Sequence, residues 1–120
     1  MSEPFIYHVC KKEEFTKALK TGRYEGSSQD RVDGFIHFSS REQVHGSVVK
    51  HRAGQDNLTL LEVDTSLLGS ELVWELSRGG QLFPHLYGPL PISSITRTAA
   101  LLLQKNGAHN FPEWLPELSD

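Results

Sequence analysis

Three histidines lie inside apolar segments of the chain, where an imidazole stands out from its neighbours. They are His8, His37 and His85. An imidazole changes its charge near neutral pH, so it can act as a general acid, a general base or a hydrogen-bonding partner of a ligand. Histidines are also often half-buried for purely structural reasons, and this interpretation stays open for each of them.

The segment around His37 combines an imidazole with a hydroxyl group. Alternate side chains of a strand share a face, so His37 lies on the same face as Ser39 and opposite Ile36 and Phe38. A predicted helix follows, and the amide groups at a helix start favour anions. These two side chains are therefore candidates for binding a ribose or phosphate oxygen. The alternative is a histidine at a sheet edge beside a serine that caps the helix.

A second candidate site is the proline-rich segment Phe-Pro-His-Leu-Tyr-Gly-Pro-Leu. Pro84 and Pro89 predict a rigid loop that presents His85 and Tyr87 to a ligand. Gly88 would allow the backbone to approach that ligand closely. Loops held by a scaffold often carry function. The alternative is a structural turn in which Tyr87 is a packing residue.

One carboxylate lies in the alternating segment Leu-Val-Trp-Glu-Leu. Alternation predicts that Leu72, Trp74 and Leu76 point inward and that Glu75 points outward. Glu75 is then a solvated sheet residue more readily than a catalytic base, although both Trp74 and Glu75 stay candidates for ligand contacts.

Several familiar catalytic motifs are missing from the sequence. It contains no G-x-G-x-x-G after a strand, no phosphate-binding loop, no G-x-S-x-G and no H-E-x-x-H. The three histidines are too far apart in sequence to predict a metal site, although convergence of all three on a metal stays open as a minor alternative. We expect no bound metal.

The first half of the chain predicts strands that alternate with two helices. Residues 5–9 predict a strand, Lys11–Lys20 a helix that Gly22 ends, and Arg23–Asp33 a surface loop. Residues 34–40 predict a strand that leads into a second helix. A Ser-x-x-Gln capping box at Ser40 begins that helix, and Gly54 ends it.

The second half of the chain predicts strands. Residues 57–64 read as a central strand and 72–76 as another, whereas the prolines of 83–91 argue against a regular interior strand. Residues 92–104 predict one or two strands, although 99–103 alone could be helical. A turn follows at 105–107, and the tail beyond it is expected to pack Phe111 and Trp114 onto the body.

These elements predict an α+β fold in a single domain of residues 1–120. Its core would span about 5–104, and the C-terminal tail 105–120 would pack on that core. Two helices from the N-terminal half would cover a mixed or antiparallel sheet of about five to six strands.

Composition narrows the expected partners and location. The chain has 120 residues, 38% of them hydrophobic and 22% charged, with a net charge of -3. Its basic residues are scattered, the densest group being Lys50, His51 and Arg52, so we do not expect nucleic acid as a partner. Its single cysteine, Cys10, suits a reducing compartment, and no segment predicts a membrane span or a secretion signal. We expect a cytoplasmic monomer with a small-molecule ligand.

Two resemblances to known families extend these predictions. The segments GFIHFSSREQV, LLEVD, LVWE and FPHLYGPL resemble the small bacterial and plant family of domains of unknown function 952 (DUF952) over residues 5–95. The order of elements more distantly resembles the catalytic domain of ADP-ribosyltransferases, especially tRNA 2′-phosphotransferases. Residues 6–10 are similar to their L-Y-H-G-T strand, 34–39 to H-V-H-L-S and 60–64 to V-L-E-V-D. Residues 19–24 and 87–91 are similar to two further segments of that domain.

The second resemblance implies an ADP-ribosyltransferase-like fold that uses NAD as a substrate. His8 would hydrogen-bond a ribose of NAD, His37 and Ser39 would line the nicotinamide side, and His85 or Tyr87 would take the place where many such enzymes have a glutamate. The sequence departs from that pattern at Val9 and Cys10, which replace a glycine and a threonine, and no glutamate obviously fills the third place.

Two functional hypotheses follow. The first is a domain that binds NAD or a related nucleotide and transfers ADP-ribose. The second is a non-enzymatic module that keeps the fold and binds a different small molecule or a peptide. The candidate catalytic residues are His8, His37, His85 and Tyr87. The candidate ligand-binding residues are Tyr7, Ser39, Gly88, Trp74 and Glu75.

Overall fold

The computed structural model describes residues 3–118, and its centre is the apolar strand β4. β4 lies between β1 and β8 in a sheet with the order β1-β4-β8-β9, and it pairs antiparallel with both neighbours. The sequence prediction of a central strand here is confirmed. The strands of this sheet are β1 (Phe5–Lys11), β4 (Leu58–Asp64), β8 (Ile95–Leu103) and β9 (His109–Asn110).

A second sheet carries two of the predicted site histidines. Its order is β3-β6-β5, with β3 (Ile36–His37), β6 (Leu82–Leu86) and β5 (Leu72–Leu76), and its register places His37 opposite His85. A third, two-stranded sheet pairs β2 (Arg23–Tyr24) with β7 (Leu90–Pro91). The fold is therefore α+β with antiparallel pairing, but the strands of residues 3–118 form three sheets instead of the predicted one.

The prediction that prolines keep residues 83–91 out of a sheet interior is wrong. β6 contains Pro84 and is the central strand of its sheet. The Pro84 carbonyl accepts a hydrogen bond from the backbone N–H of Phe38 at 3.0 Å. A strand residue points its nitrogen to the same side as its carbonyl, so the missing N–H faces the region just past the end of β3. Pro84 therefore cannot return a second hydrogen bond to the Phe38 carbonyl, and β3 ends at His37, just before this position.

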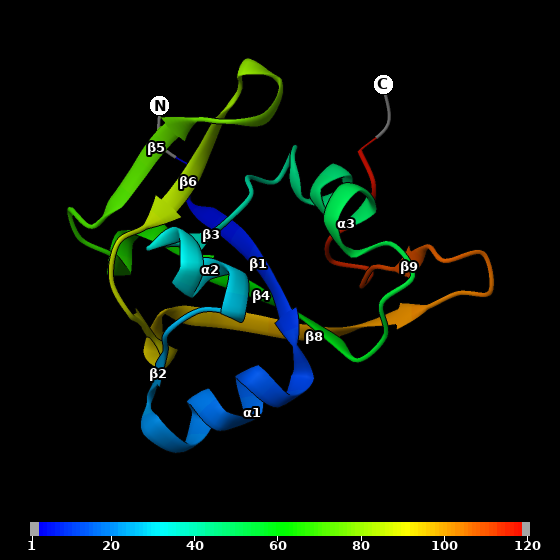
Figure 1. Ribbon diagram of the computed structural model, residues 1–120, viewed down its shortest axis with the longest axis horizontal. Coiled ribbons are helices and arrows are strands. Elements are labelled where there is room, and N and C mark those ends of the chain that lie inside the picture. Colours follow the sequence, from blue (N-terminus) through cyan, green and yellow to red (C-terminus); the bar gives the residue numbers. More distant parts are fainter. Residues whose placement is uncertain (1–2, 119–120) are drawn as a thin grey trace.

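Within the described residues, three α-helices surround β1, one more than the sequence predicted. They are α1 (Lys12–Thr21), α2 (Ser28–Asp33) and α3 (Val44–Arg52), and β1 runs between α2 and α3 (Figure 1). Gly22 ends α1 at φ 83°, in the left-handed conformation that glycine favours, as predicted. Part of the capping box predicted at Ser40 is present, because the Gln43 side chain accepts a hydrogen bond from the Ser40 N–H at 3.0 Å. The helix α3 itself begins later than predicted, at Val44.

The predicted surface loop Arg23–Asp33 is also wrong. It contains β2 and α2 and buries Tyr24, Ser27 and Asp30. The Ser27 side chain accepts from the N–H of Asp30, and the Asp30 carboxylate accepts from the N–H of Ser27 at 2.7 Å. This reciprocal cap stabilises a short helix whose sequence has no apolar periodicity.

Alternation along β1 divides the core in two. Ile6 and Cys10 pack in one hydrophobic cluster with Ala18 of α1, whereas Tyr7 packs in the other with Val44 of α3. The backbones of Tyr7 and Ser39 also exchange two hydrogen bonds of 2.8 Å, which join the first sheet to the segment after β3. β1 is thus held on both sides.

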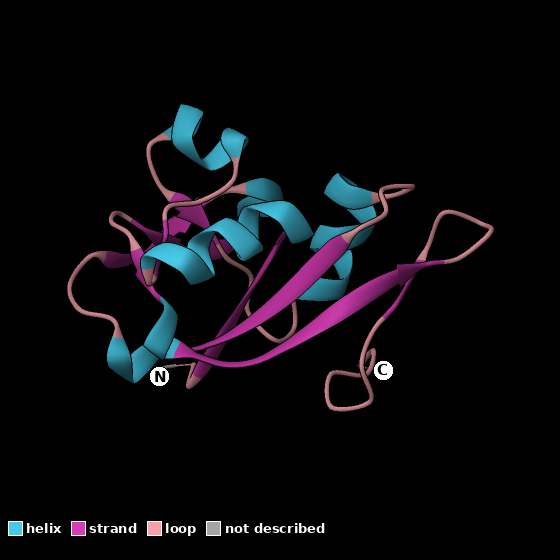
Figure 2. Ribbon diagram, turned by 90° about the horizontal axis from the view of Figure 1, so that it is seen from below, coloured by secondary structure: helices cyan, strands magenta, loops and turns pink. Residues whose placement is uncertain are grey.

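The C-terminal segment packs on the body, as expected. The β8–β9 hairpin extends beyond the rest of the molecule at one end (Figure 2), and the chain then returns so that Leu115 is buried, with Phe111 and Trp114 partly buried beside it. Residues 95–103 form a strand throughout, not a helix. None of the helices within residues 3–118 combines the length and apolar character that a membrane span requires.

Candidate functional site

An open pocket of about 770 Å³ lies over β1, and His8, His37 and His85 all line it. They come from three strands, β1, β3 and β6. The register explains how two of them meet, because His37 and His85 are directly opposite and their rings are 5.5 Å apart. Tyr7 and Ser39 line the same pocket. A volume of this size is typical of small-molecule sites.

His8 is buried, and both of its ring nitrogens are engaged inside the protein. Nδ1 lies 2.5 Å from the His37 carbonyl oxygen, which can only accept, so Nδ1 carries the proton. Nε2 then accepts from the Tyr24 hydroxyl at 2.8 Å. Burial lowers the pKa of His8, against the opposing charge of Asp30, and therefore favours the neutral ring. His8 has no nitrogen left for a ligand in this arrangement.

His37 lies between two carboxylates of α2. Its Nδ1 is 2.5 Å from Asp30 Oδ1, and its Nε2 is 3.0 Å from Asp33 Oδ2. The hydrogen bond to Asp30 raises the pKa of His37, against partial burial, and both carboxylates add to the rise. Two carboxylates facing both nitrogens favour the doubly protonated, cationic imidazole.

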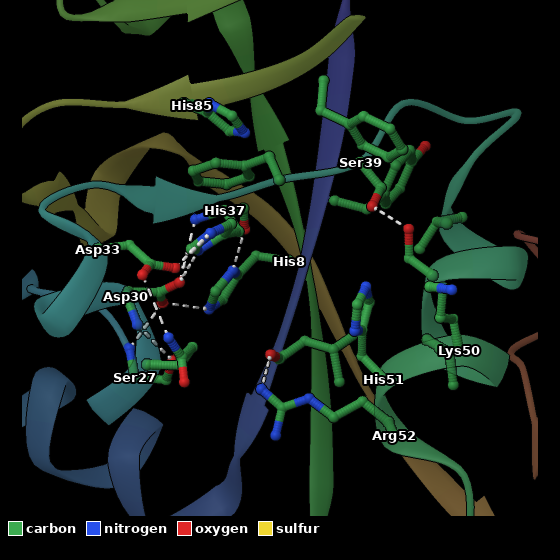
Figure 3. Close-up of a pocket in the computed structure, with 18 of the residues that line it drawn as sticks. His8, Ser27, Asp30, Asp33, His37, Ser39, Lys50, His51, Arg52 and His85 are labelled. Atoms are coloured by element: carbon green, nitrogen blue, oxygen red, sulfur yellow. Dashed lines mark hydrogen bonds and ion pairs between the residues drawn. The ribbon is translucent and has the colours of Figure 1, made fainter. Parts of the chain in front are cut away.

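Asp30 is the buried centre of this group. Burial would raise the pKa of its carboxyl, but hydrogen bonds from the His37 ring and from the backbone N–H groups of Ser27 and His37 hold it at about 2. Asp30 therefore stays ionised inside the protein at any ordinary pH. We call Asp30, Asp33, His8 and His37 the acidic wall of the pocket (Figure 3).

His85 differs from the other two histidines because only one of its nitrogens is engaged. Its Nδ1 lies 2.7 Å from Glu75 Oε1, and no residue within 3–118 hydrogen-bonds its Nε2. Glu75 also accepts from the Tyr87 hydroxyl at 2.7 Å. The hydrogen bonds from His85 and Tyr87 lower the pKa of Glu75. A carboxylate at Nδ1 orients the ring and leaves Nε2 free to accept a proton.

An aromatic residue connects the two ends of the histidine cluster. The Phe35 ring stacks on His85 with centroids 4.1 Å apart, and it contacts His37 at 4.5 Å and Tyr87 at 5.2 Å. The predicted grouping of Phe35 with His37 on one strand face is confirmed, since Ile36 and Phe38 point into the core. Ser39 is apart from this cluster and donates to the Ser47 hydroxyl at 2.8 Å.

The opposite side of the pocket is basic. The last turn of α3 contributes Lys50, His51 and Arg52, across β1 from the acidic wall (Figure 3). Arg78, from the turn between β5 and β6, joins them through an Nη1–Nε2 distance of 2.6 Å to His51. We call these four residues the basic wall. The pocket is therefore bipolar.

Four predicted site residues, Trp74, Glu75, Tyr87 and Gly88, do not line this pocket. Trp74 packs against the hydrophobic core instead, opposite Pro84 in the sheet. Tyr87 is exposed and donates to Glu75, and the Glu71 carboxylate occupies the space beside the Gly88 backbone. The expectation of a proline-braced loop is wrong for Pro84 and His85, which lie in β6, whereas Tyr87, Gly88 and Pro89 do form the bend between β6 and β7.

Comparison with known proteins places the chain in a family. Residues 9–98 match the family described as "Protein of unknown function (DUF952)". The chain belongs to this family. No curated protein matches it.

Solved structures of one family relative share the fold. The crystal structure of protein CC0527 from Caulobacter crescentus is 46% identical, covers 88% of this chain and 93% of its own, and superposes with a TM-score of 0.85. The solution NMR structure of the same protein is 47% identical, covers 87% of this chain and 90% of its own, and has a TM-score of 0.76. Neither name gives an activity.

The site of this DUF952 protein contains residues that sequence reasoning missed. Asp30 and Asp33 fall in the predicted surface loop, although Ser27 three residues before Asp30 is a helix-capping pattern. Lys50, His51 and Arg52 form the densest basic group of the sequence. This group is too small to predict nucleic-acid binding, and its spacing alone does not predict an anion site. Nothing local pointed to Arg78, because its partners lie 27 and 31 positions away.

Among the described residues 3–118, no group of three or more histidine, cysteine or acidic side chains is arranged to hold a metal ion. The minor alternative of a three-histidine metal site in this DUF952 protein therefore has no support.

Proposed function

We propose that this protein binds NAD or a related nucleotide in the bipolar pocket, as an ADP-ribosyltransferase-like domain. The observation that carries the proposal is that histidines from three strands line one pocket whose opposite wall is basic. NAD has the matching charge pattern, with a cationic nicotinamide ring and an anionic diphosphate. Electrostatic complementarity favours the ring near the acidic wall and the diphosphate near the basic wall.

The residues take different roles in this proposal. His37 lines the nicotinamide side, as the resemblance to ADP-ribosyltransferases implies, whereas Ser39 lies beside Ser47 at the basic wall and would face the rest of the nucleotide. His8 positions His37 through its hydrogen bond to the His37 carbonyl, since its own nitrogens are both engaged. His85 is the base, because Glu75 holds its Nδ1 and its Nε2 stays available.

Transfer of ADP-ribose would follow the ordinary chemistry of a glycosidic bond. The bond between the ribose carbon and nicotinamide breaks, and nicotinamide leaves with the electron pair. The acceptor oxygen, from water or a hydroxyl, bonds to the ribose carbon while its proton moves to Nε2 of His85.

A second candidate function is a binding module without catalysis. The observation that favours it is that all four ring nitrogens of His8 and His37 are already paired inside the protein. These two histidines would then shape the pocket and perform no chemistry on its ligand.

Calorimetry with NAD, together with a nicotinamide-release assay, tests both functions. We compare the wild type with His85→Gln, and with Lys20→Gln as a control outside the pocket. His85→Gln should keep NAD affinity within about threefold and slow nicotinamide release by about a hundredfold or more, the usual contribution of a general base. Lys20→Gln should change neither quantity.

The outcomes separate the two candidates. NAD binding without nicotinamide release would exclude the transferase function and support the binding module. No NAD binding at millimolar concentration would overturn the proposal that the pocket is a nucleotide site.

A further inference from the structure

The basic wall is a connected group, not a scatter of surface charges. Arg78 Nη1 lies 2.6 Å from Nε2 of His51, and its Nη2 donates to the Ser47 hydroxyl at 3.2 Å. Its guanidinium also lies over the Phe83 ring, 4.9 Å from the centroid. Arg78 therefore ties the β5–β6 turn to α3 at the edge of the pocket, with Lys50 and Arg52 beside it.

These cations have no acidic partners in the described chain. No carboxylate within residues 3–118 lies within 4 Å of the charged nitrogens of Lys50, Arg52 or Arg78, whereas Arg97 on another part of the molecule pairs with Glu62 at 3.0 Å. Arg52 donates to the neutral oxygens of Val9 and Gln55 instead.

The acidic residues that line the pocket already pair with groups other than these cations. Asp30 and Asp33 hold His37, and Glu14 accepts from the backbone N–H of Lys11 at the start of α1. A positive surface with this much unmatched charge is complementary to an anion.

His51 is held neutral by its surroundings. Partial desolvation lowers its pKa, and the neighbouring charges of Arg78 and Lys50, with smaller effects from His37 and Arg52, lower it further. All of these neighbours are cationic or can become so. In the neutral form Nε2 accepts from Arg78, and adding a proton there would bring two cations into contact unless an anion lay between them.

We propose that Arg78, Lys50, Arg52 and His51 form a proton-linked phosphate site, in which His51 takes up a proton when a phosphate group binds. This proposal rests on the pocket proposed above for NAD, and it places the phosphate groups at the basic wall of that pocket. Bound phosphate would sit between Arg78 and His51 and would convert the imidazole from an acceptor of the guanidinium into a donor to the anion.

Linkage gives the sign of the pH dependence. Because the anion favours the protonated imidazole, bound anion raises the pKa of His51, and anion affinity must rise as the pH falls through that range. An anion site built only from lysine and arginine would keep a constant affinity over the same range.

Sulfate is a suitable probe because its charge is constant over this pH range. We measure its affinity by NMR titration of the full chain from about pH 7.5 to about pH 5.5, which brackets the ordinary imidazole pKa. The affinity of the wild type should increase by about tenfold as the pH falls. His51→Gln should remove this increase, so that its sulfate affinity is the same at both ends of the pH range, and Arg78→Gln should weaken sulfate binding by about tenfold throughout.

A charge-matched control and NAD distinguish this inference from the proposed function. Lys105→Gln, in the β8–β9 turn, loses the same charge outside the pocket and should leave sulfate binding unchanged. Sulfate affinity that does not vary with pH, or that survives Arg78→Gln, overturns the phosphate site even if NAD binds. Proton-linked sulfate binding without NAD binding supports the phosphate site and overturns only the nucleotide proposal.

Discussion

Two buried carboxylates, Asp30 and Glu62, are stabilised in their ionised form by different kinds of partner. Both are almost fully buried, and in both burial would raise the carboxyl pKa while surrounding hydrogen bonds lower it. Asp30 is neutralised by a titratable partner, His37, and faces the pocket. Glu62 is neutralised by a permanent cation, Arg97, and lies outside the pocket lining.

The surroundings of Glu62 show what a purely structural group looks like in this fold. Its two oxygens accept four hydrogen bonds from side chains, from Tyr7 at 3.0 Å, Thr96 at 2.7 Å and Arg97 at 3.0 and 3.1 Å. Trp114 of the C-terminal segment then covers the guanidinium at 4.2 Å. The Asp30 group is instead left open on one side, with the His37 side chain two-fifths exposed.

Burial alone therefore does not distinguish a functional carboxylate from a structural one in this protein. A group whose partner can lose its proton, and whose edge is open to a pocket, can respond to a ligand. A group locked to arginine and covered by the chain cannot.

The largest expected effect comes from neutralising each carboxylate. At about pH 6, Asp30→Asn and Glu62→Gln should each lower the free energy of unfolding by about 3 kcal/mol, because each amide places an N–H₂ against buried donors. At about pH 9 the cost of Asp30→Asn should shrink, since His37 loses its proton, while that of Glu62→Gln persists. Urea denaturation at both pH values measures this. Equal pH dependence of the two costs would contradict the distinction.

A smaller effect should follow from removing one tyrosine hydroxyl in each group. Tyr24→Phe leaves the buried Nε2 of His8 without a donor and should cost about 2 kcal/mol. Tyr7→Phe removes one of several donors to Glu62 and should cost about 1 kcal/mol. Thermal or urea unfolding of both variants tests the order. A larger loss for Tyr7→Phe would show that His8 can find another donor.

The smallest effect is in the pH profile of stability near neutrality. The pKa of His37 is raised on folding, so its contribution is complete below the unfolded value of about 6.5 and is lost as the pH rises through the folded value. The pKa of His8 is lowered, so its contribution is present above about 6.5 and is lost as the pH falls below it.

Stability should therefore decline on both sides of about pH 6.5. The alkaline decline should be below about 1 kcal/mol, because His37 is partly exposed to solvent. His37→Gln should flatten it, whereas Arg97→Gln should not change its shape. An alkaline decline that survives in His37→Gln would show that another group titrates.

The long, regular elements could be predicted from the sequence because they bury whole faces. The apolar run of residues 57–64 predicted a central strand, and β4 confirms it. The short elements could not be predicted in this way. α2 has six residues and is held by the reciprocal cap of Ser27 and Asp30, and β6 tolerates Pro84 only because β3 ends beside it.

The same limit applies to the site. The histidines were conspicuous because each interrupts an apolar segment, and the strand register then brings His37 opposite His85. The acidic wall and Arg78 were missed because their roles depend on contacts between distant elements, which no local pattern encodes. The roles predicted for His8, His37 and His85 stay predictions.

A titration of isotope-labelled protein with NAD, followed by amide and imidazole resonances, tests the central proposal most directly. We expect saturable shifts at His37, His51, Arg78 and His85, on both walls of the pocket, and none at Arg97 or Trp114. No shift at millimolar NAD, or shifts confined to the surroundings of Arg97, would contradict the proposal.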